Sequence, residues 1–264
     1  MLGLLSAAWR FRHFILSSVR NEFAGRFARS RLGGLWMILN PLAQAAIVAF
    51  VLSSVLAARL PGLTSSYGYA LYLMAGTLGW SLFSETVSRC LVVFTENGNL
   101  LKKLVFPRIC LPLVVSGIAV VSNLLLVAAT FAVFVALGHL PGAQALWLPL
   151  LLVLTLALAL GLGLTLGVLN VFVRDIGQVV PILLQFAFWL TPIIYVPELL
   201  PAQFRALLSL NPLYPLVSAY QHVLVYGTAP DWASLAWVAL LSAGLLVFSL
   251  LLFRRASAEM VDVL

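Results

Sequence analysis

The chain contains an uninterrupted apolar run, Leu148-Pro-Leu-Leu-Leu-Val-Leu-Thr-Leu-Ala-Leu-Ala-Leu-Gly-Leu162. The run has no charge and no regular alternation of polar with apolar residues, which disfavours a strand of a membrane β-barrel. It is part of a longer charge-free window, and about 20 such residues are enough for a helix to cross a bilayer. We therefore expect a membrane-spanning helix here.

The composition extends this expectation to the whole chain. Of 264 residues, 63% are hydrophobic and 9% are charged, whereas a soluble domain has about 45 to 50% apolar and about 25% charged residues. Because the bilayer core offers no partner to loose backbone groups, we predict an all-α integral membrane protein. Residues 1–264 form a single transmembrane domain in this prediction, with six transmembrane helices at 32–58, 66–92, 109–138, 145–173, 176–197 and 232–253.

The Lys and Arg residues are distributed unevenly between the two sides of these six spans. The side that holds both termini carries twelve of them, and the other side carries Arg59 and Arg205. Positive residues accumulate on the cytoplasmic side, so we predict a bacterial inner-membrane protein with both termini cytoplasmic. This bias accounts for most of the net charge of +7 without a nucleic-acid partner.

Residues 1–31 are predicted to form a cytoplasmic amphipathic helix. Aromatic and aliphatic residues recur there every four positions, among several arginines: Phe11, Ile15, Val19, Phe23 and Phe27. This pattern suits a helix on an anionic membrane surface. The alternative is a basic flank that only sets topology; a signal peptide is disfavoured because no cleavage pattern follows.

A second amphipathic helix is predicted at 96–104, in the longest cytoplasmic connection. Its leucines fall on one helical face, and Pro107 ends it. It is either a docking element for a cytoplasmic partner or a simple interfacial loop. The candidate docking residues are Glu96, Asn99, Leu100, Lys102, Lys103 and Leu104.

The chain is irregular beyond the fifth span. Pro192 should kink that span, and residues 198–226 contain two apolar pieces that are each too short to cross about 30 Å. We expect short re-entrant or gate helices on the periplasmic side, such as often line a transport pathway. A plain outer loop is the alternative.

Aromatic residues gather toward the outer ends of the second and fifth spans. They form either the aromatic belt of a membrane protein or surfaces along which the apolar C–H faces of sugars slide. The candidate channel-lining residues are Tyr69, Tyr72, Trp80, Phe83, Phe186, Trp189 and Tyr195.

Two charged residues lie within the second span. Glu85 and Arg89 are four residues apart and can pair on one helical face, which offsets part of the cost of a charge in the membrane. They are either a snorkelling pair near an interface or a subunit or pathway contact. Two isolated cysteines and three scattered histidines show no metal-ligand spacing, so we expect no metal and no cofactor in this chain.

Several motifs give the chain a family resemblance over residues 10–255. They are Arg31-Leu-Gly-Gly-Leu-Trp36 with Asn40-Pro41, Asn99-Leu-Leu-Lys-Lys-Leu-Val-Phe-Pro-Arg-Ile-Cys-Leu-Pro112, Val173-Arg-Asp-Ile-Gly-Gln178 and Leu210-Asn-Pro-Leu213. With these motifs the chain resembles the membrane (permease) subunit of type-2 ABC exporters for O-antigen, capsular polysaccharide or teichoic acid.

The resemblance implies the ABC-2 transporter fold and a homodimer that works with two copies of a cytoplasmic ABC ATPase. In that family the helix at 96–104 would be the coupling helix seated on the ATPase, and 198–226 would be the periplasmic gate helices. Aromatic residues facing the channel would guide the polymer. ATP and Mg would bind to the ATPase, while this chain would contact the lipid-linked polysaccharide and membrane lipids.

The sequence is consistent with a separate motor. ATPases cradle phosphates with a Gly-x-x-x-x-Gly-Lys-Ser/Thr loop, and the only lysines here, Lys102 and Lys103, lie between two leucines. We therefore predict no enzyme activity in this chain. Because the Glu-Ala-Ala loop of ABC importers is not recognisable, export is favoured.

The predicted function is the permease step that moves a lipid-linked polysaccharide from the cytoplasm to the periplasm and cell surface, with O-antigen ahead of capsule or teichoic acid. One alternative is an ABC-2 exporter of a lipid, haem or drug. A secondary transporter is less favoured because it should bury several carboxylates at mid-membrane, and only Glu85 approaches that position.

Overall fold

The computed structural model describes residues 9–29, 32–50, 67–98, 102, 107–197, 201, 203, 208, 210–257 and 259–263. Every regular element in these ranges is helical. The helices are α2 (Arg12–Arg29), α3 (Trp36–Phe50), α4 (Gly68–Glu96), α6 (Cys110–Ala136), α7 (Leu148–Phe172), α8 (Ile176–Leu190), α10 (Leu213–Gln221), α11 (Trp232–Ala256) and α12 (Met260–Val263). Short turns are η1 (Gly33–Leu35), η3 (Ala143–Trp147) and the π-helical η5 (His222–Tyr226).

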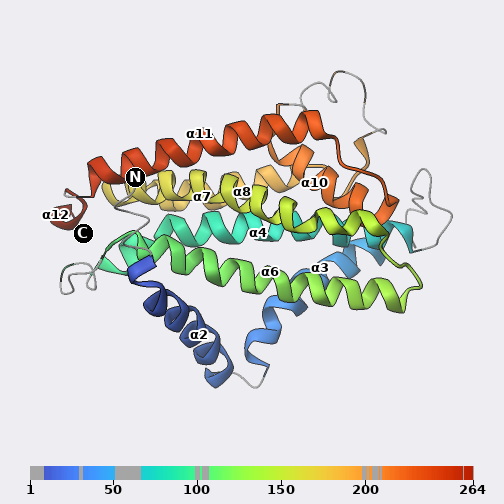
Figure 1. Ribbon diagram of the computed structural model, residues 1–264, viewed down its shortest axis with the longest axis horizontal. Helices are drawn as coiled ribbons and strands as arrows, with labels where there is room; N and C mark the ends of the chain where they lie inside the picture. Colours follow the sequence, from blue (N-terminus) through green and yellow to red (C-terminus); the bar gives the residue numbers. More distant parts are fainter. Residues whose placement is uncertain are drawn as a thin grey trace.

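The long helices α4, α6, α7 and α11 lie nearly along one axis, with α8 among them (Figure 1). Helix α7 packs between α4 and α11, and α6 packs against α4. One end of this bundle holds the ends of α4, α7 and α11 and the starts of α6 and α8. The arginines at 108, 174, 254 and 255 lie there, in the pattern typical of a cytoplasmic end.

Three stretches are long and apolar enough to cross a membrane among the described residues: Cys110–Ala136, Ala143–Phe172 and Trp232–Ala256. Helix α4 is also long enough but carries charged residues, and α8 has only 15 residues. The six-span arrangement therefore stays a prediction. Helix α8 ends at Leu190, earlier than the predicted end at 197, because Thr191 is extended before Pro192.

Small residues bring α7 into close contact with α4. Gly163 lies against the side chain of Cys90, and a Cβ atom at Gly167 would overlap the Cys90 carbonyl oxygen. Asn170 Nδ2 donates a hydrogen bond to the carbonyl oxygen of Leu91 at 2.9 Å. Close backbone approach through small residues is a common way to join helices in a membrane. It fixes α7 closely against α4.

The C-terminal end of α8 is held against the bundle by α10. Tyr220 is fully buried, with its ring against Gly79 of α4 and its hydroxyl 3.3 Å from that of Thr155 of α7. Gln221 Nε2 donates to the carbonyl oxygen of Pro192 at 3.1 Å. The described part of the predicted gate segment thus packs tightly against α4 and the turn after α8. Most of residues 198–209 lies outside the described residues.

Helix α2 projects from the bundle at an angle (Figure 1). It contacts α6, where a Cβ atom added to Gly117 would lie 2.8 Å from the Val19 side chain. Ile15 and Val19 are half-buried, while Arg12 and Arg20 are exposed. The helix therefore has an apolar side on the bundle and a charged side away from it. Residues 1–8 of the predicted amphipathic segment lie outside the described residues.

A polar and aromatic groove as candidate functional site

Helices α3, α4 and α8 form the walls of a groove of about 730 Å³ that is open on one side. From Leu73 to Ser88 it follows α4 for about 22 Å at 1.5 Å per residue. The residues that line it are Trp36, Asn40, Pro41, Gln44, Leu73, Thr77, Trp80, Ser81, Ser84, Glu85, Ser88, Pro181, Leu184, Gln185, Phe188, Trp189, Ile193 and Ile194.

Hydroxyl groups line the α4 side of the groove. They lie at intervals of four, three and four residues, which puts them on one helical face: Thr77, Ser81, Ser84 and Ser88. Thr77 Oγ1 donates to the carbonyl oxygen of Leu73 at 2.7 Å, and Ser84 Oγ donates to the backbone carbonyl oxygen of Ser81 at 3.4 Å. A hydroxyl that donates to its own helix keeps oxygen lone pairs as acceptors. The stripe therefore offers acceptors to a ligand.

Amide side chains face the groove from the other two helices. Asn40 and Gln44 come from α3, and Gln185 comes from α8. All three are exposed and make no hydrogen bond within the described part of the chain. Each amide has two donor hydrogens and an acceptor oxygen. Together with the hydroxyl stripe, they give the groove donors and acceptors on facing walls.

Aromatic rings complete the half of the groove near the C-terminal end of α8. The rings of Trp80 and Phe188 are 5.4 Å apart in an edge-to-face contact, and Phe188 touches Trp189 in the same way at 5.8 Å. Trp189 is 60% exposed. Trp80 and Trp189 were predicted as channel residues, whereas Phe188 and Trp36 were not. A surface with apolar rings beside polar groups suits a sugar, because a sugar ring has an apolar C–H face and hydroxyl groups at its edge.

The other predicted channel residues do not line the groove. Tyr69, Tyr72 and Phe83 are buried, and the Tyr69 and Tyr72 hydroxyls donate to backbone carbonyls in the turn after α8. Phe186 is 64% exposed on another side of α8. Tyr195 is half-buried and donates to the carbonyl oxygen of Leu190 at 3.1 Å. The tyrosines of α4 thus fasten the turn after α8, which closes one end of the groove.

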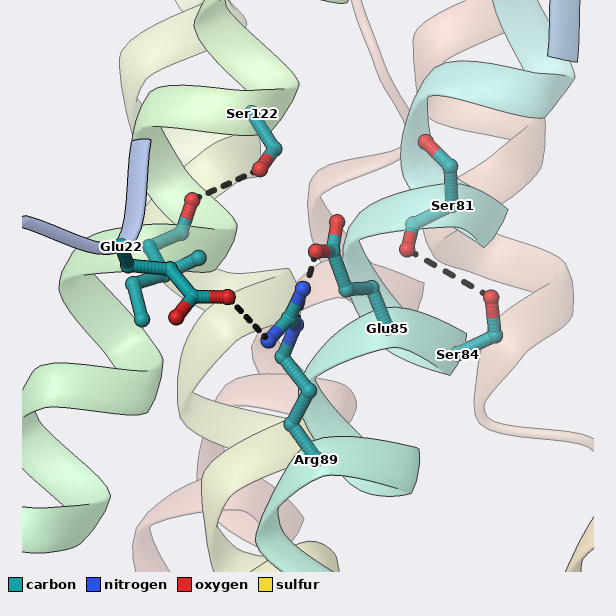
Figure 2. Close-up of polar contacts among 7 residues, drawn as sticks. Glu22, Ser81, Ser84, Glu85, Arg89 and Ser122 are labelled. Atoms are coloured by element: carbon teal, nitrogen blue, oxygen red, sulfur yellow. Dashed lines mark hydrogen bonds and ion pairs between the residues drawn. The ribbon is translucent and has the colours of Figure 1, made fainter. Parts of the chain in front are cut away.

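Arg89 lies between two carboxylates beside the groove (Figure 2). Its Nε atom donates to Glu85 Oε1 at 2.9 Å, as the four-residue spacing allows. Its Nη1 atom is 3.8 Å from Glu22 Oε1, so the guanidinium also links α4 to α2. All three side chains keep between 27% and 42% of their surface exposed. Glu85 lines the groove, while Arg89 faces away from it.

The predicted coupling residues fall mostly outside the described residues, as Asn99, Leu100, Lys103 and Leu104 all do. Glu96 is exposed at the end of α4, and Lys102 is also exposed. No group of three His, Cys, Asp or Glu that would suit a metal ion occurs within the described ranges.

Of the residues that line the groove, sequence reasoning named Trp80 and Trp189 as channel candidates and Glu85 as a charged residue within a span, but it did not single out the hydroxyl and amide groups. One signal was available: the helical period that reveals apolar faces also puts the α4 hydroxyls on one face. No comparable signal marked Gln44 or Gln185, because a side chain becomes part of the groove only when α3 and α8 meet α4.

Comparison with known proteins gives the chain a family. A family model described as ABC-2 type transporter matches residues 14–225. An O-antigen export system permease protein of Klebsiella pneumoniae is 27% identical over 88% of this chain and 89% of its own length. Another, from Myxococcus xanthus, is 27% identical over 99% of both chains. A polysialic acid transport protein of Escherichia coli is 25% identical over 91% of this chain and 92% of its own.

The family model covers well over half of the chain, and the relatives match the chain over most of its length. Three long apolar helices agree with a protein of the membrane. The chain is an integral membrane protein, and it belongs to the ABC-2 type transporter family.

Proposed function

We propose that this chain is the permease subunit of an ATP-driven exporter that moves a lipid-linked polysaccharide, with O-antigen as the first candidate, across the bacterial inner membrane. The groove along α4 is the observation that carries the proposal, because it combines polar and aromatic walls on helices of a membrane protein. The names of the relatives support a polysaccharide as cargo.

The groove chemistry suits a sugar chain that must move. Sugar hydroxyls would exchange hydrogen bonds along the α4 stripe, and the C–H faces of the rings would rest on Trp80, Phe188 and Trp189. Each contact is weak, and the same kind recurs along about 22 Å. Transport requires binding that is strong enough for entry and weak enough for exit. A row of similar weak sites along the groove would allow the polymer both to enter and to leave.

The open side of the groove supports a homodimer. Hydroxyl and amide groups facing lipid would lose hydrogen bonds to water without replacement, which is costly. A second copy of the chain would cover the groove and turn it into an enclosed path. Helix α8 offers an exposed apolar stripe beside the groove for that contact: Val179, Ile182, Leu183, Phe186, Trp189 and Leu190.

In this proposal the chain spans the membrane six times with both termini in the cytoplasm, and two ATPase subunits dock on the helix at 96–104. The arginines that cluster at one end of the bundle support that orientation. Replacing Lys102 and Lys103 together by Glu should then weaken docking. Unchanged co-purification of the double variant with the ATPase would contradict the docking role.

The test is to delete the gene and to fractionate the cells. Loss of surface polysaccharide together with accumulation of finished lipid-linked polymer on the inner membrane is the expected result, and the composition of that polymer would identify the cargo. Normal surface polysaccharide would overturn the proposed cargo and favour export of a lipid, haem or drug by the same family.

A further inference from the structure

A second cavity, of about 470 Å³, lies between α2, α4 and α6. Its lining includes the end of α4 and the start of α6. These helix ends belong to the arginine-rich end of the bundle, near α2 (Figure 1). The cavity is distinct from the groove, since only Ser88 lines both spaces. An amphipathic helix on a membrane surface packs at the level of lipid headgroups. The cavity therefore lies where a lipid would meet the protein.

One wall of this cavity is apolar. It consists of side chains from three helices: Phe14 of α2, Val92 and Val93 of α4, and Leu111, Val114, Val115 and Ile118 of α6. This wall offers contact to a hydrocarbon chain and no hydrogen-bonding group. A ligand that covers it must bring its own apolar part, which excludes a small free anion as the natural occupant.

The remaining lining is polar and carries both signs of charge. Arg89 uses Nε for Glu85 and Nη1 for Glu22, while its Nη2 atom has no hydrogen-bond partner in the described part of the chain (Figure 2). Glu96 lies two helical turns further along α4, is exposed, and has no ion pair among the described residues. The cavity thus holds a guanidinium donor near Glu22, with a second carboxylate beyond it.

These charges select among lipid headgroups. A phosphate would accept hydrogen bonds from Arg89, and an amine on the same headgroup would donate to Glu22 or Glu96. A primary ammonium has three donor hydrogens, which a quaternary ammonium lacks. A headgroup with only negative charge would satisfy Arg89 but would leave two carboxylates facing it. The charge arrangement therefore matches a phosphate followed by a primary amine.

We propose that this cavity binds one phosphatidylethanolamine molecule, with its phosphate at Arg89, its ammonium at Glu22 and Glu96, and an acyl chain on the α6 wall. The lipid would fill the space between α2 and the bundle and hold α2 in place. This inference requires that the chain lies in a membrane, and it is independent of which polymer the chain exports.

Native mass spectrometry can test the site on the full-length permease purified with its ATPase. The complex is reconstituted into nanodiscs with equal amounts of phosphatidylethanolamine, phosphatidylglycerol and phosphatidylcholine of identical acyl chains, and the retained lipids are counted. We expect one phosphatidylethanolamine per permease, retained at least about twofold over the others, as partly exposed ion pairs allow. Equal retention of the three lipids would overturn the proposal.

Two variants locate the site. Glu96→Gln should reduce the preference for phosphatidylethanolamine, whereas Glu259→Gln, an exposed glutamate at the same end but outside the cavity lining, should keep it. Val114→Trp should fill the cavity and remove the bound lipid. The proposal fails if both Gln variants lose the preference equally, or if Val114→Trp retains the lipid. Because no readout involves export, these results are separable from the deletion test above.

Discussion

The hydroxyl stripe of α4 gives a sharp test of the groove, because the chain provides a matched control. Thr77 and Ser84 line the groove and donate to the carbonyl oxygens four and three residues earlier, at 2.7 and 3.4 Å. Thr165 and Ser257 make the same two local hydrogen bonds, at 2.8 and 3.2 Å, but lie outside the groove lining. All four side chains are half-buried.

The perturbation is the double variant Thr77→Val with Ser84→Ala, and the control is Thr165→Val with Ser257→Ala. Both pairs lose the same kinds of local bond, so their effects on stability should be similar. Only the first pair loses acceptors for the sugar. At about 0.5 to 1.5 kcal/mol per hydrogen bond, two lost bonds are worth about 1 to 3 kcal/mol. Groove occupancy should then fall by about 5-fold to 140-fold.

The assay follows the appearance of pulse-labelled polysaccharide on the surface of deletion cells that carry each variant, normalised to the amount of permease in the membrane. The groove variant should export at least about fivefold more slowly than the control. Equal rates for the two double variants at equal protein levels would refute the reasoning that the stripe contacts the polymer.

Two further predictions concern stability. Gly167→Ala should lower the free energy of unfolding by about 1 to 3 kcal/mol because the new methyl group overlaps the backbone of α4. Gly244→Ala, with open space around it, should stabilise α11 by up to about 1 kcal/mol. Thermal unfolding in detergent measures both effects, and equal melting temperatures of the two variants would contradict the packing account. Asp231 caps α11, and hydrogen bonds, first from the Ser234 hydroxyl, lower the pKa of its carboxyl group. The cap should therefore stabilise the protein above a pH of about 4 and lose this effect as the pH falls through the lowered pKa. Asp231→Ala should lower the melting temperature at pH 7, and the difference from the unmodified protein should shrink as the pH falls below about 4.

The sequence predicted the positions of the long helices better than the contacts between them. The windows 109–138, 145–173 and 232–253 lie within a few residues of Cys110–Ala136, Ala143–Phe172 and Trp232–Ala256. The thickness of the bilayer sets the length of such a window, so a spanning helix can be recognised from the length of one charge-free run of consecutive residues. The same local reading foresaw the Glu85 and Arg89 contact, since a helix alone brings residues four apart together.

The groove required information that no local pattern contains. Tyr72 was assigned to the channel because it is aromatic and near the outer end of a span, yet it is buried under the turn that follows α8. That turn lies more than a hundred residues further along the chain. Gln185 had no distinguishing feature in the sequence and gains a role only where α8 faces α4. Contacts between distant helices decided both cases.

The central claim is that the exported glycan passes along the α4 groove. Photo-crosslinking from a light-activated amino acid placed at Gln185, in the groove, and at Leu240, on the exposed side of α11, tests it most directly in exporting cells. The account predicts permease adducts that carry the cell's own polysaccharide from position 185 and none from position 240. Adducts of equal yield from both positions, or none from position 185 while export continues, would contradict it.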